Sequence, residues 1–254
     1  MTVSIITVVY NAQGTIRASI ESVLSQRYAK TEYVIVDGAS NDGTMSIVNE
    51  YRHRIAKIIS EPDKGIYDAM NKGIEIASGD VIGILNADDI YENRDIISMI
   101  VREFESTKCD VVYGDLRIYR TIDPKRPWRK WKSGKMTRSK IARGWHPPHP
   151  ATFVKKEVYR KYGSYDISFK IAADYEFMIR VLYCHELLPA YIPQYLVRMR
   201  AGGISSSGIK GTKKRIMEDY VVIRRYGLNW LTLAMKVARK IPQMLGGIAW
   251  FAGR

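Results

Sequence analysis

The first half of the chain alternates between short apolar runs and longer amphipathic segments. The apolar runs are rich in valine and isoleucine and have the length of β-strands, and Asn, Asp or Gly follows most of them. Between the runs, apolar residues recur at the three- and four-residue spacing of one helix face. The pattern predicts strands at residues 3–10, 33–36, 55–60, 81–85 and 110–119, and helices at 15–26, 45–51, 66–77 and 94–106. Strands that alternate with helices predict a mostly parallel α/β sheet flanked by helices.

Polar side chains follow the predicted strands at their carboxyl ends. Asn11 follows the first strand, Asp37 the second and Glu61 the third, and the pair Asp88-Asp89 follows the fourth. The carboxyl ends of parallel strands meet along one edge of the sheet, where the ligands of open α/β folds bind. A hydrophobic core does not by itself require a polar residue after each strand. The pattern therefore predicts a nucleotide-type site at that edge.

The acid pair Asp88-Asp89 comes directly after the apolar run at residues 81–85. Two adjacent carboxylates repel each other and are costly to desolvate, which argues against a place in the core. A divalent cation such as Mg²⁺ or Mn²⁺ would hold them together, because hard oxygen ligands suit both ions, and the ions in turn suit a diphosphate. The other interpretation of this dipeptide alone is a solvated turn ahead of a helix that starts near Asn93.

Charge divides the chain into two unlike halves. Residues 1–115 contain 11 Lys and Arg against 18 Asp and Glu, for a net charge of −7, whereas residues 116–254 contain 29 against 8, for a net charge of +21. The acidic half suits a ligand bridged by a cation. The basic half suits an anionic partner. The alternatives are a phospholipid surface, a lipid diphosphate and a nucleic acid.

Cysteine usage and the start of the chain bear on the compartment. Cys109 and Cys184 are the only cysteines and lie far apart, which argues for a reducing environment and against a disulfide framework or a zinc site. The first strand begins at Val3 without a basic leader, and no apolar run reaches about 18 residues, so neither a signal peptide nor a spanning helix is predicted. We expect a cytoplasmic protein with a peripheral position on the inner face of the cell membrane as one option.

Several motifs in one order resemble the family 2 glycosyltransferases, which are inverting enzymes of the GT-A fold. The motifs are VSIITVVYN at residues 3–11, EYVIVDGASNDGT at 32–44 and NKGIEIASGDVIGILNADD at 71–89. The likeness is close over residues 1–115 and looser as far as about residue 205. Three motifs in the same order are far more specific than the acid pair alone.

The resemblance implies roles for residues at the predicted edge of the sheet. Three residues near the end of the first strand would line the nucleobase pocket: Val8, Tyr10 and Asn11. Asp37 would accept a hydrogen bond from the base, as expected for uracil, and Asn71 would assist in this pocket or at the diphosphate. Asp88 would face the ribose, and Asp89 would coordinate the metal ion that bridges the diphosphate oxygens.

An inverting transfer needs a general base that removes the proton of the acceptor hydroxyl. The resemblance places this base at Asp174, which opens a predicted helix with apolar residues such as Phe177 on its buried side. Glu176 is the alternative carboxylate, and a helix N-cap is the alternative role for Asp174.

Four further residues are candidates for contacts with the acceptor or the diphosphate: Asp68, His149, Arg198 and Arg200. Asp68 lies in the first turn of a predicted helix, where the helix dipole alone favours an acid. His149 lies in a proline-rich segment ahead of an apolar strand. The two arginines lie at the end of a strand predicted at residues 191–199, just before a Gly- and Ser-rich loop of the kind that closes over the donor in this family.

Two basic segments carry aromatic or apolar residues. Residues 120–140 hold nine Lys and Arg against one Asp, with two tryptophans between them, and tryptophan prefers the membrane interface to water. Residues 228–241 predict an amphipathic helix with Leu231 and Met235 on its apolar side and Lys236 opposite, which is typical of helices at a membrane surface. The other interpretations are a solvated loop and a helix packed on the domain.

Together these patterns predict a GT-A α/β fold with a C-terminal helical extension. Residues 1–115 would bind the nucleotide sugar, 116–227 would bind the acceptor and carry the base, and 228–254 would form an amphipathic, membrane-associating segment. The expected reaction moves one hexosyl or N-acetylhexosaminyl group from a nucleotide donor, UDP-linked by preference, with Mn²⁺ or Mg²⁺ as cofactor. The acceptor would be a saccharide or a lipid-linked saccharide of surface polysaccharide synthesis, at an anionic membrane surface.

Two other function classes stay open from the sequence. A nucleotidyltransferase of similar sheet would use the same acid pair, but it normally needs a Gly-rich basic loop where this chain has NAQGTIR. A basic nucleic-acid-binding module would suit the isoelectric point near 9.7. It leaves the acid-tipped strands unexplained, so we expect no nucleic-acid partner.

Overall fold

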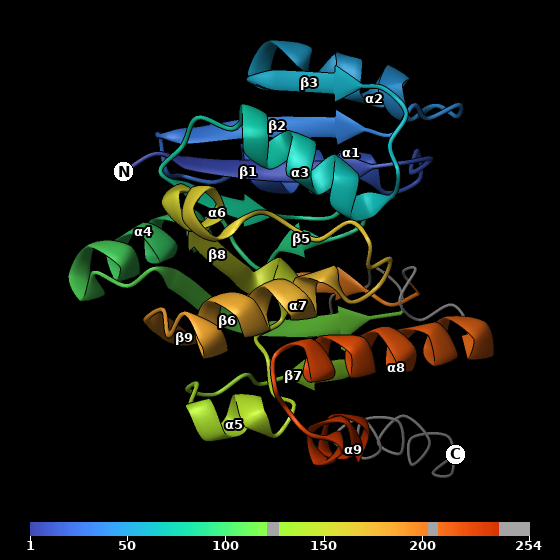
Figure 1. Ribbon diagram of the computed structural model, residues 1–254. Helices are drawn as coiled ribbons and strands as arrows, with labels where there is room; N and C mark the ends of the chain where they lie inside the picture. The colour runs from blue at the N-terminus through green and yellow to red at the C-terminus, as the bar shows by residue number, and fades with distance from the viewer. Residues whose placement is uncertain (121–126, 203–207, 239–254) are drawn as a thin grey trace, which may run out of the picture.

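A computed structural model describes residues 1–120, 127–202 and 208–238 (Figure 1). The strands are β1 (Val3–Val9), β2 (Thr31–Asp37), β3 (Lys57–Ser60), β4 (Val81–Ile84), β5 (Ile90–Tyr91), β6 (Val111–Tyr119), β7 (Arg129–Trp131), β8 (Thr152–Lys155) and β9 (Pro189–Arg200). The helices are α1 (Ile16–Leu24), α2 (Thr44–Glu50), α3 (Ile66–Ile76), α4 (Ile96–Thr107), α5 (Arg138–Ala142), α6 (Lys156–Tyr162), α7 (Ala173–Ile179), α8 (Gly208–Arg225) and α9 (Trp230–Ala238). The helices and strands predicted in the first half are all present.

The nine strands of the described residues form one mixed sheet in the order β3-β2-β1-β4-β8-β6-β9-β5, with β7 paired to β6. Strands β1 to β4 pair in parallel, and all seven residues of β1 are buried, as expected of a central parallel strand. Strand β8 runs antiparallel between β4 and β6, so β6 and its parallel neighbour β9 point the same way as β1. The carboxyl ends of these strands therefore share one edge of the sheet (Figure 1).

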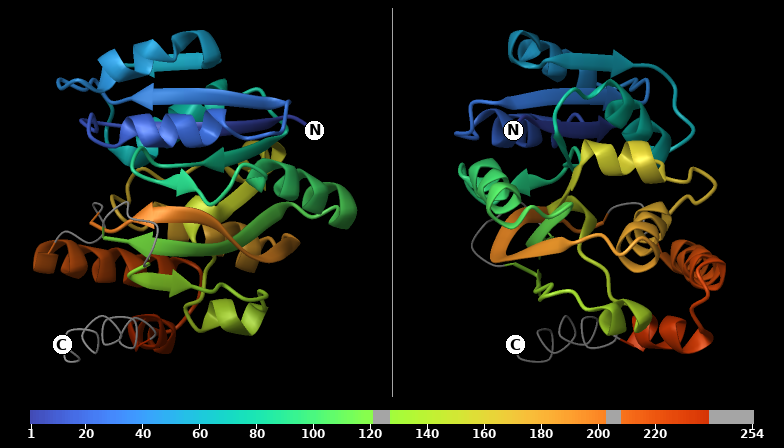
Figure 2. Two further views of the ribbon diagram at one scale, coloured as in Figure 1. Left: turned by 180° about the vertical axis from the view of Figure 1, so that it is seen from behind. Right: turned by 60° about the vertical axis from the view of Figure 1, so that its left-hand side comes forward.

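Helices cover both faces of the sheet and bury separate halves of the core. Along β1, Ile6 and Val8 face one side, whereas Ile5 and Val9 face the other, which follows from the two-residue period of a strand. The first side is covered by α3, α6 and α7, and the second by α1, α2 and α4 (Figures 1 and 2). This arrangement confirms the predicted sheet flanked by helices.

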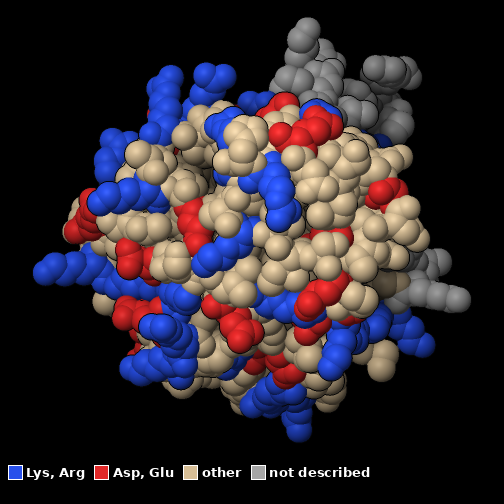
Figure 3. All heavy atoms as spheres, turned by 90° about the horizontal axis from the view of Figure 1, so that it is seen from above, with Lys and Arg blue, Asp and Glu red and all other residues tan. Residues whose placement is uncertain are grey.

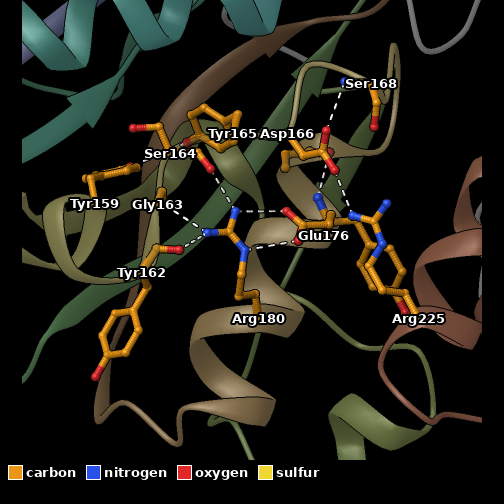
Figure 4. Close-up of polar contacts among 12 residues, drawn as sticks. Tyr159, Tyr162, Gly163, Ser164, Tyr165, Asp166, Ser168, Glu176, Arg180 and Arg225 are labelled. Atoms are coloured by element: carbon orange, nitrogen blue, oxygen red, sulfur yellow. Dashed lines mark hydrogen bonds and ion pairs between the residues drawn. The ribbon is translucent and has the colours of Figure 1, made fainter.

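A buried ion pair fixes α7 in the second half of the chain. Glu176 is 2% exposed, and its carboxylate accepts hydrogen bonds from Arg180 at 3.0 and 2.9 Å and from the hydroxyl of Tyr226, the residue after α8. Arg180 also donates to the carbonyl oxygens of residues 162–164, at the C-terminal end of α6 (Figure 4). Glu176 therefore holds the fold together, which argues against its use as the general base.

The packing of α9 differs from the amphipathic pattern expected for it. Lys236, predicted on the polar side, is 5% exposed and makes an ion pair of 2.6 Å with Asp219 of α8, while its ammonium group lies over the ring of Tyr175. Leu231, predicted on the apolar side, is 47% exposed. The buried carboxylate of Asp219 draws Lys236 inward, which rotates the apolar residues of α9 outward. The predicted positions beyond residue 238, and those at 121–126, lie outside the described residues.

The two cysteines and the described helices bear on the expectations of no disulfide and no membrane-spanning helix. Cys109 is buried, Cys184 is exposed, and both thiols are free. Within the described part of the chain, no helix combines the length and the apolar character that crossing a bilayer requires.

We expect Arg180→Met to lower the free energy of unfolding by about 3 kcal/mol, because Glu176 would keep a buried charge without its partner. The matched control is Arg17→Met, which removes an ion pair with Glu50 whose side chains are 46% and 50% exposed. Since water screens that pair, the control should lose far less stability. Urea unfolding of both variants measures the difference, and equal losses would contradict a buried anchor at Glu176.

Candidate active site

The loops after β1 and β2 are joined at the carboxyl edge of the sheet. Asn11 has a φ of 49°, which asparagine tolerates better than most residues. Its N–H donates to Oγ of Ser40 at 2.8 Å, and its Oδ1 accepts from the N–H of Asn41 at 2.9 Å. These bonds hold the SNDGT motif against the end of β1. Tyr10, one residue earlier, leaves its ring 62% exposed at this edge.

Asp37 and Val8 form the buried layer beneath this edge. Asp37 ends β2 fully buried, and its carboxylate accepts hydrogen bonds from the N–H of Ser40 at 3.1 Å and from the hydroxyl of Ser60 at 2.7 Å. These contacts link the loop after β2 to the end of β3. Val8 is 5% exposed on the neighbouring strand. Of the predicted nucleobase residues, Tyr10 and Asn11 are therefore exposed, whereas Val8 and Asp37 are buried.

Gly38 leaves room for the carboxylate of Asp63 beside the ring of Tyr10. A Cβ atom at residue 38 would lie 2.3 Å from Oδ2 of Asp63 and 3.5 Å from the ring of Tyr10, so any other residue would displace the Asp63 side chain. Asp63 is held by the N–H of Gly65, which donates to its Oδ1 at 2.7 Å. Asp63 was not among the site residues that the sequence pattern predicted. Its only sequence signal is the Asp-Lys-Gly turn ahead of α3.

The acid pair after β4 lies at the junction with β9, where Asp89 is buried and Asp88 half-buried. Asp89 is 1% exposed; its Oδ1 accepts from the backbone N–H of Arg200 at 3.0 Å, and its Oδ2 accepts from the side-chain amide of Asn86 at 3.1 Å. Burial raises the pKa of Asp89 well above its usual value, and the neighbouring charge of Asp88 raises it further. Burial also raises the pKa of Asp88, against the opposing effect of the Arg200 charge.

The acid pair and Asn86 fit a divalent cation that phosphate oxygens of the substrate would also bind. The raised pKa values show that two negative charges are costly here, and a cation would offset that cost. Oδ1 of Asn86 is buried without a hydrogen-bond partner and would be a third oxygen beside the pair. Among the described residues no three His, Cys, Asp or Glu gather as a complete protein cage. Mg²⁺-like ions usually take one or two carboxylates together with substrate phosphates.

Asp174 is held near the carboxyl edge by α3. The hydroxyl of Tyr67, in the first turn of α3, lies 3.2 Å from Oδ1 of Asp174 and 2.8 Å from the carbonyl oxygen of Ile171. The N–H of Tyr175 also donates to Oδ1 of Asp174, at 2.8 Å. The N-cap position of α7 is Ala172, so Asp174 lies inside the helix and is not its N-cap.

His149 points into a group of tyrosines beside Asp174. Its Nε2 lies 2.8 Å from the hydroxyl of Tyr165, which lies 3.4 Å from the hydroxyl of Tyr159. Burial lowers the pKa of His149, and the charge of Asp174 opposes this effect. The neutral imidazole is therefore favoured. No feature of the sequence identifies Tyr165 as its partner.

Asn71 and Asp68 both make contacts within the fold. The amide of Asn71 bonds the backbone of Tyr165 in both directions, donating to its carbonyl at 2.8 Å and accepting from its N–H at 2.9 Å. Asp68 accepts from the N–H of Lys64 at 3.0 Å and lies 3.7 Å from the ammonium group of Lys72.

The two predicted arginines differ in their surroundings. Arg198 makes an ion pair of 3.2 Å with Glu92, directly after β5, and shares this carboxylate with Arg117 at 2.6 Å. Arg200 contributes its backbone N–H to Asp89, and its side chain lies close enough to Asp88 to lower the pKa of that carboxyl. Of the two, Arg200 is the one that the structure brings to the acid pair.

Two solved structures share this fold. S. aureus TarS, solved in complex with UDP-GlcNAc, superposes with a TM-score of 0.71 at 17% identity, covering 95% of this chain and 73% of that one. The mannosyltransferase PcManGT from Pyrobaculum calidifontis, solved with GDP-Man and Mn²⁺, gives a TM-score of 0.63 at 16% identity, covering 98% and 78%. At these identities the likeness shows the fold, which is the GT-A fold.

Sequence comparison shows the family. WfaP of Escherichia coli, a UDP-Glc:alpha-D-GlcNAc-diphosphoundecaprenol beta-1,3-glucosyltransferase, is 39% identical over 99 residues, or 39% of each chain. An uncharacterised glycosyltransferase of Mycobacterium tuberculosis is 33% identical over 241 residues, covering 89% of this chain and 85% of the relative. The model of glycosyl transferase family 2 matches residues 4–163. Because that match spans more than half of the chain, the protein belongs to glycosyl transferase family 2 and is a glycosyltransferase of the GT-A fold that uses a nucleotide-sugar donor.

Proposed function

We propose that the protein is a metal-dependent, inverting glycosyltransferase that moves one sugar from a UDP-linked donor to a hydroxyl of a lipid-linked saccharide. The observation that carries this proposal is the placement of two separate acidic groups at the carboxyl edge of one sheet. Asp88 and Asp89 follow β4, and Asp174 on α7 is held there by Tyr67 of α3. A metal-dependent inverting transfer uses acidic groups of these two kinds, one that holds the cation on the leaving-group side and one that takes the acceptor proton.

The donor would lie across the ends of β1, β2 and β4. Tyr10 and Asn11 would pack against the base and Asp88 would bind the ribose, while the buried Asp37 would hold the loop at Ser40 in place beneath them. Their places at one edge support this assignment, as do the UDP-GlcNAc bound to TarS and the UDP-Glc in the name of WfaP. A divalent cation held by Asp89 would neutralise the negative charge that develops on the departing diphosphate.

Asp174 would act as the general base. Its carboxylate would take the proton of the acceptor hydroxyl while that oxygen forms a bond to the anomeric carbon of the donor. The bond from that carbon to the β-phosphate oxygen breaks at the same time, and its electron pair leaves with UDP. The contacts of Tyr67 and Tyr175 both involve Oδ1 of Asp174, so we assign proton removal to Oδ2.

The acceptor would bind to the second half of the chain, at residues 116–227. The net charge of +21 over residues 116–254 suits a lipid diphosphate, and the name of WfaP includes an acceptor of that kind. Arg200, beside the acid pair, would instead meet the departing diphosphate of the donor. Such an acceptor would place the reaction at the inner face of the cell membrane, in surface polysaccharide synthesis.

The donor site can be tested with Asp89→Ala and with the shape-conserving Asp89→Asn. At a UDP concentration of about 100 times the dissociation constant, UDP with Mn²⁺ should stabilise the wild type by about 2.7 kcal/mol, and both variants should lose most of this. Thermal unfolding with UDP-, GDP- and dTDP-sugars, with and without Mn²⁺, measures the effect. Asp95→Ala, which removes a half-exposed acid six residues after Asp89, is the control. An undiminished Mn²⁺-dependent shift in both variants would place the metal elsewhere.

The general base can be tested with Asp174→Asn. We expect kcat to fall by roughly 10²- to 10⁴-fold, the usual contribution of general base catalysis, while the dissociation constant of UDP stays close to that of the wild type. Asp166→Asn, which breaks only a half-exposed ion pair with Arg225, is the matched control. Steady-state transfer and calorimetric UDP binding give the two quantities. Parallel losses of UDP affinity and of transfer would assign Asp174 a structural role instead.

A further inference from the structure

The outer side of α8 and the adjoining α9 expose an unusual amount of apolar surface. Seven of the eleven large hydrophobic side chains exposed within the described residues belong to these two helices: Ile216, Met217, Tyr220, Val221, Trp230, Leu231 and Val237. On α8 the spacing of 216, 217, 220 and 221 places them along one side of the helix. A groove lined by Tyr220, Leu228 and Trp230 continues this surface between α8 and α9. We call this surface the α8–α9 face.

The fold itself does not need these side chains, because α8 packs through its other side. Val222 and Ile223 are fully buried there, and Asp219 makes the buried ion pair with Lys236 of α9. The exposed residues Met217 and Val221 therefore add nothing to this packing. A contiguous apolar surface of this kind usually marks an interaction site.

The charges on this face are mostly positive. Lys213, Lys214 and Arg224 of α8 are exposed beside the apolar side chains. Of the two acidic residues of α8, Asp219 is buried in its ion pair, and Glu218, which borders Lys214 and Met217, accepts hydrogen bonds from the N–H groups of residues 170–172. At the opposite end of the molecule, over α2 and β3, basic and acidic side chains are interspersed (Figure 3). The face thus combines apolar and aromatic groups with an excess of positive charge.

We propose that the α8–α9 face docks the protein on a bilayer that contains anionic phospholipids. Tyr220 and Trp230 have the amphipathic rings that favour the membrane interface, Met217 and Val221 would enter the acyl boundary, and the cations would meet the lipid phosphates. A second copy of the chain is a poorer occupant. A two-fold interface would bring the same patch of Lys213, Lys214 and Arg224 against itself.

Docking through this face would place the acceptor side of the candidate site next to the lipid, a consequence that rests on the proposed function. Glu218 of α8 accepts hydrogen bonds from the N–H groups of residues 170–172 at 2.8 to 3.1 Å, directly before α7. Asp174 lies in the first turn of α7. The helix whose outer side would contact the bilayer thus supports, through its inner side, the segment that carries the proposed base.

The docking face can be tested by co-sedimentation of the complete protein with sucrose-loaded vesicles. Vesicles of phosphatidylcholine with phosphatidylglycerol should bind the wild type, and vesicles of phosphatidylcholine alone should bind it at least about tenfold more weakly, because the cations would lack their partner. The apolar variant is Met217→Ser with Val221→Ser. The charge variant is Lys213→Gln, Lys214→Gln and Arg224→Gln. Each variant should lose most of the binding to the anionic vesicles.

Matched controls alter exposed residues elsewhere in the fold. Leu188→Ser removes an apolar side chain that is 66% exposed, and Lys30→Gln with Arg52→Gln and Arg160→Gln removes three exposed cations. Both controls should bind anionic vesicles like the wild type. Equal binding to the two kinds of vesicle, or binding that neither docking variant weakens, would overturn the proposal. A dimer that the apolar variant abolishes, without vesicle binding by the wild type, would overturn it in favour of a second copy.

The test is independent of the reaction. Vesicle binding requires neither nucleotide nor metal ion, and the docking variants should keep the thermal shift with UDP and Mn²⁺ of the wild type. A protein that binds anionic vesicles but no nucleotide sugar would contradict only the proposed donor. One that binds the nucleotide sugar but no vesicles would contradict only the docking face.

Discussion

The burial of the Asp89 carboxylate is the constraint on which the candidate site depends. A buried negative charge is costly unless hydrogen bonds or cations offset it, and here the N–H of Arg200 and the amide of Asn86 supply the bonds. Arg200 lies at the end of β9, more than a hundred residues along the chain. Strand β5, directly after the acid pair, makes this contact possible because it crosses the sheet to pair with β9. One carboxylate thus joins the two halves of the chain at the point where the chemistry is proposed.

The segment that carries Asp174 is fixed by a different set of contacts. The N–H groups before a helix have no partner within it and need acceptors from elsewhere. Glu218 of α8 accepts from these groups, Tyr67 of α3 bonds to Asp174, and the buried pair of Glu176 and Arg180 fixes the rest of α7. The two acidic groups are therefore positioned independently, one by the sheet and the other by surrounding helices.

The sequence predicted the parts of the fold that local patterns specify. Runs rich in valine and isoleucine gave β1, β2, β4 and β6, because strands buried on both faces leave few other choices. The acids at the carboxyl edge followed from the geometry of parallel strands, and the family match confirms a glycosyltransferase over a nucleotidyltransferase or a nucleic-acid-binding module. Contacts between distant residues could not be predicted in this way. The partner of His149, Tyr165, has no sequence signal, and the burial of Lys236 depends on a carboxylate of another helix.

The paired bonds between Asn71 and the backbone of Tyr165 also restrict how the molecule can deform. An amide is the side chain that offers a donor and an acceptor side by side, so a carboxylate at this place would face the carbonyl oxygen of Tyr165 with the wrong polarity. These two hydrogen bonds therefore couple the movement of α3 to that of the segment around Tyr165. A sugar acceptor that needs more room would therefore gain it from movement elsewhere than between α3 and the segment around Tyr165.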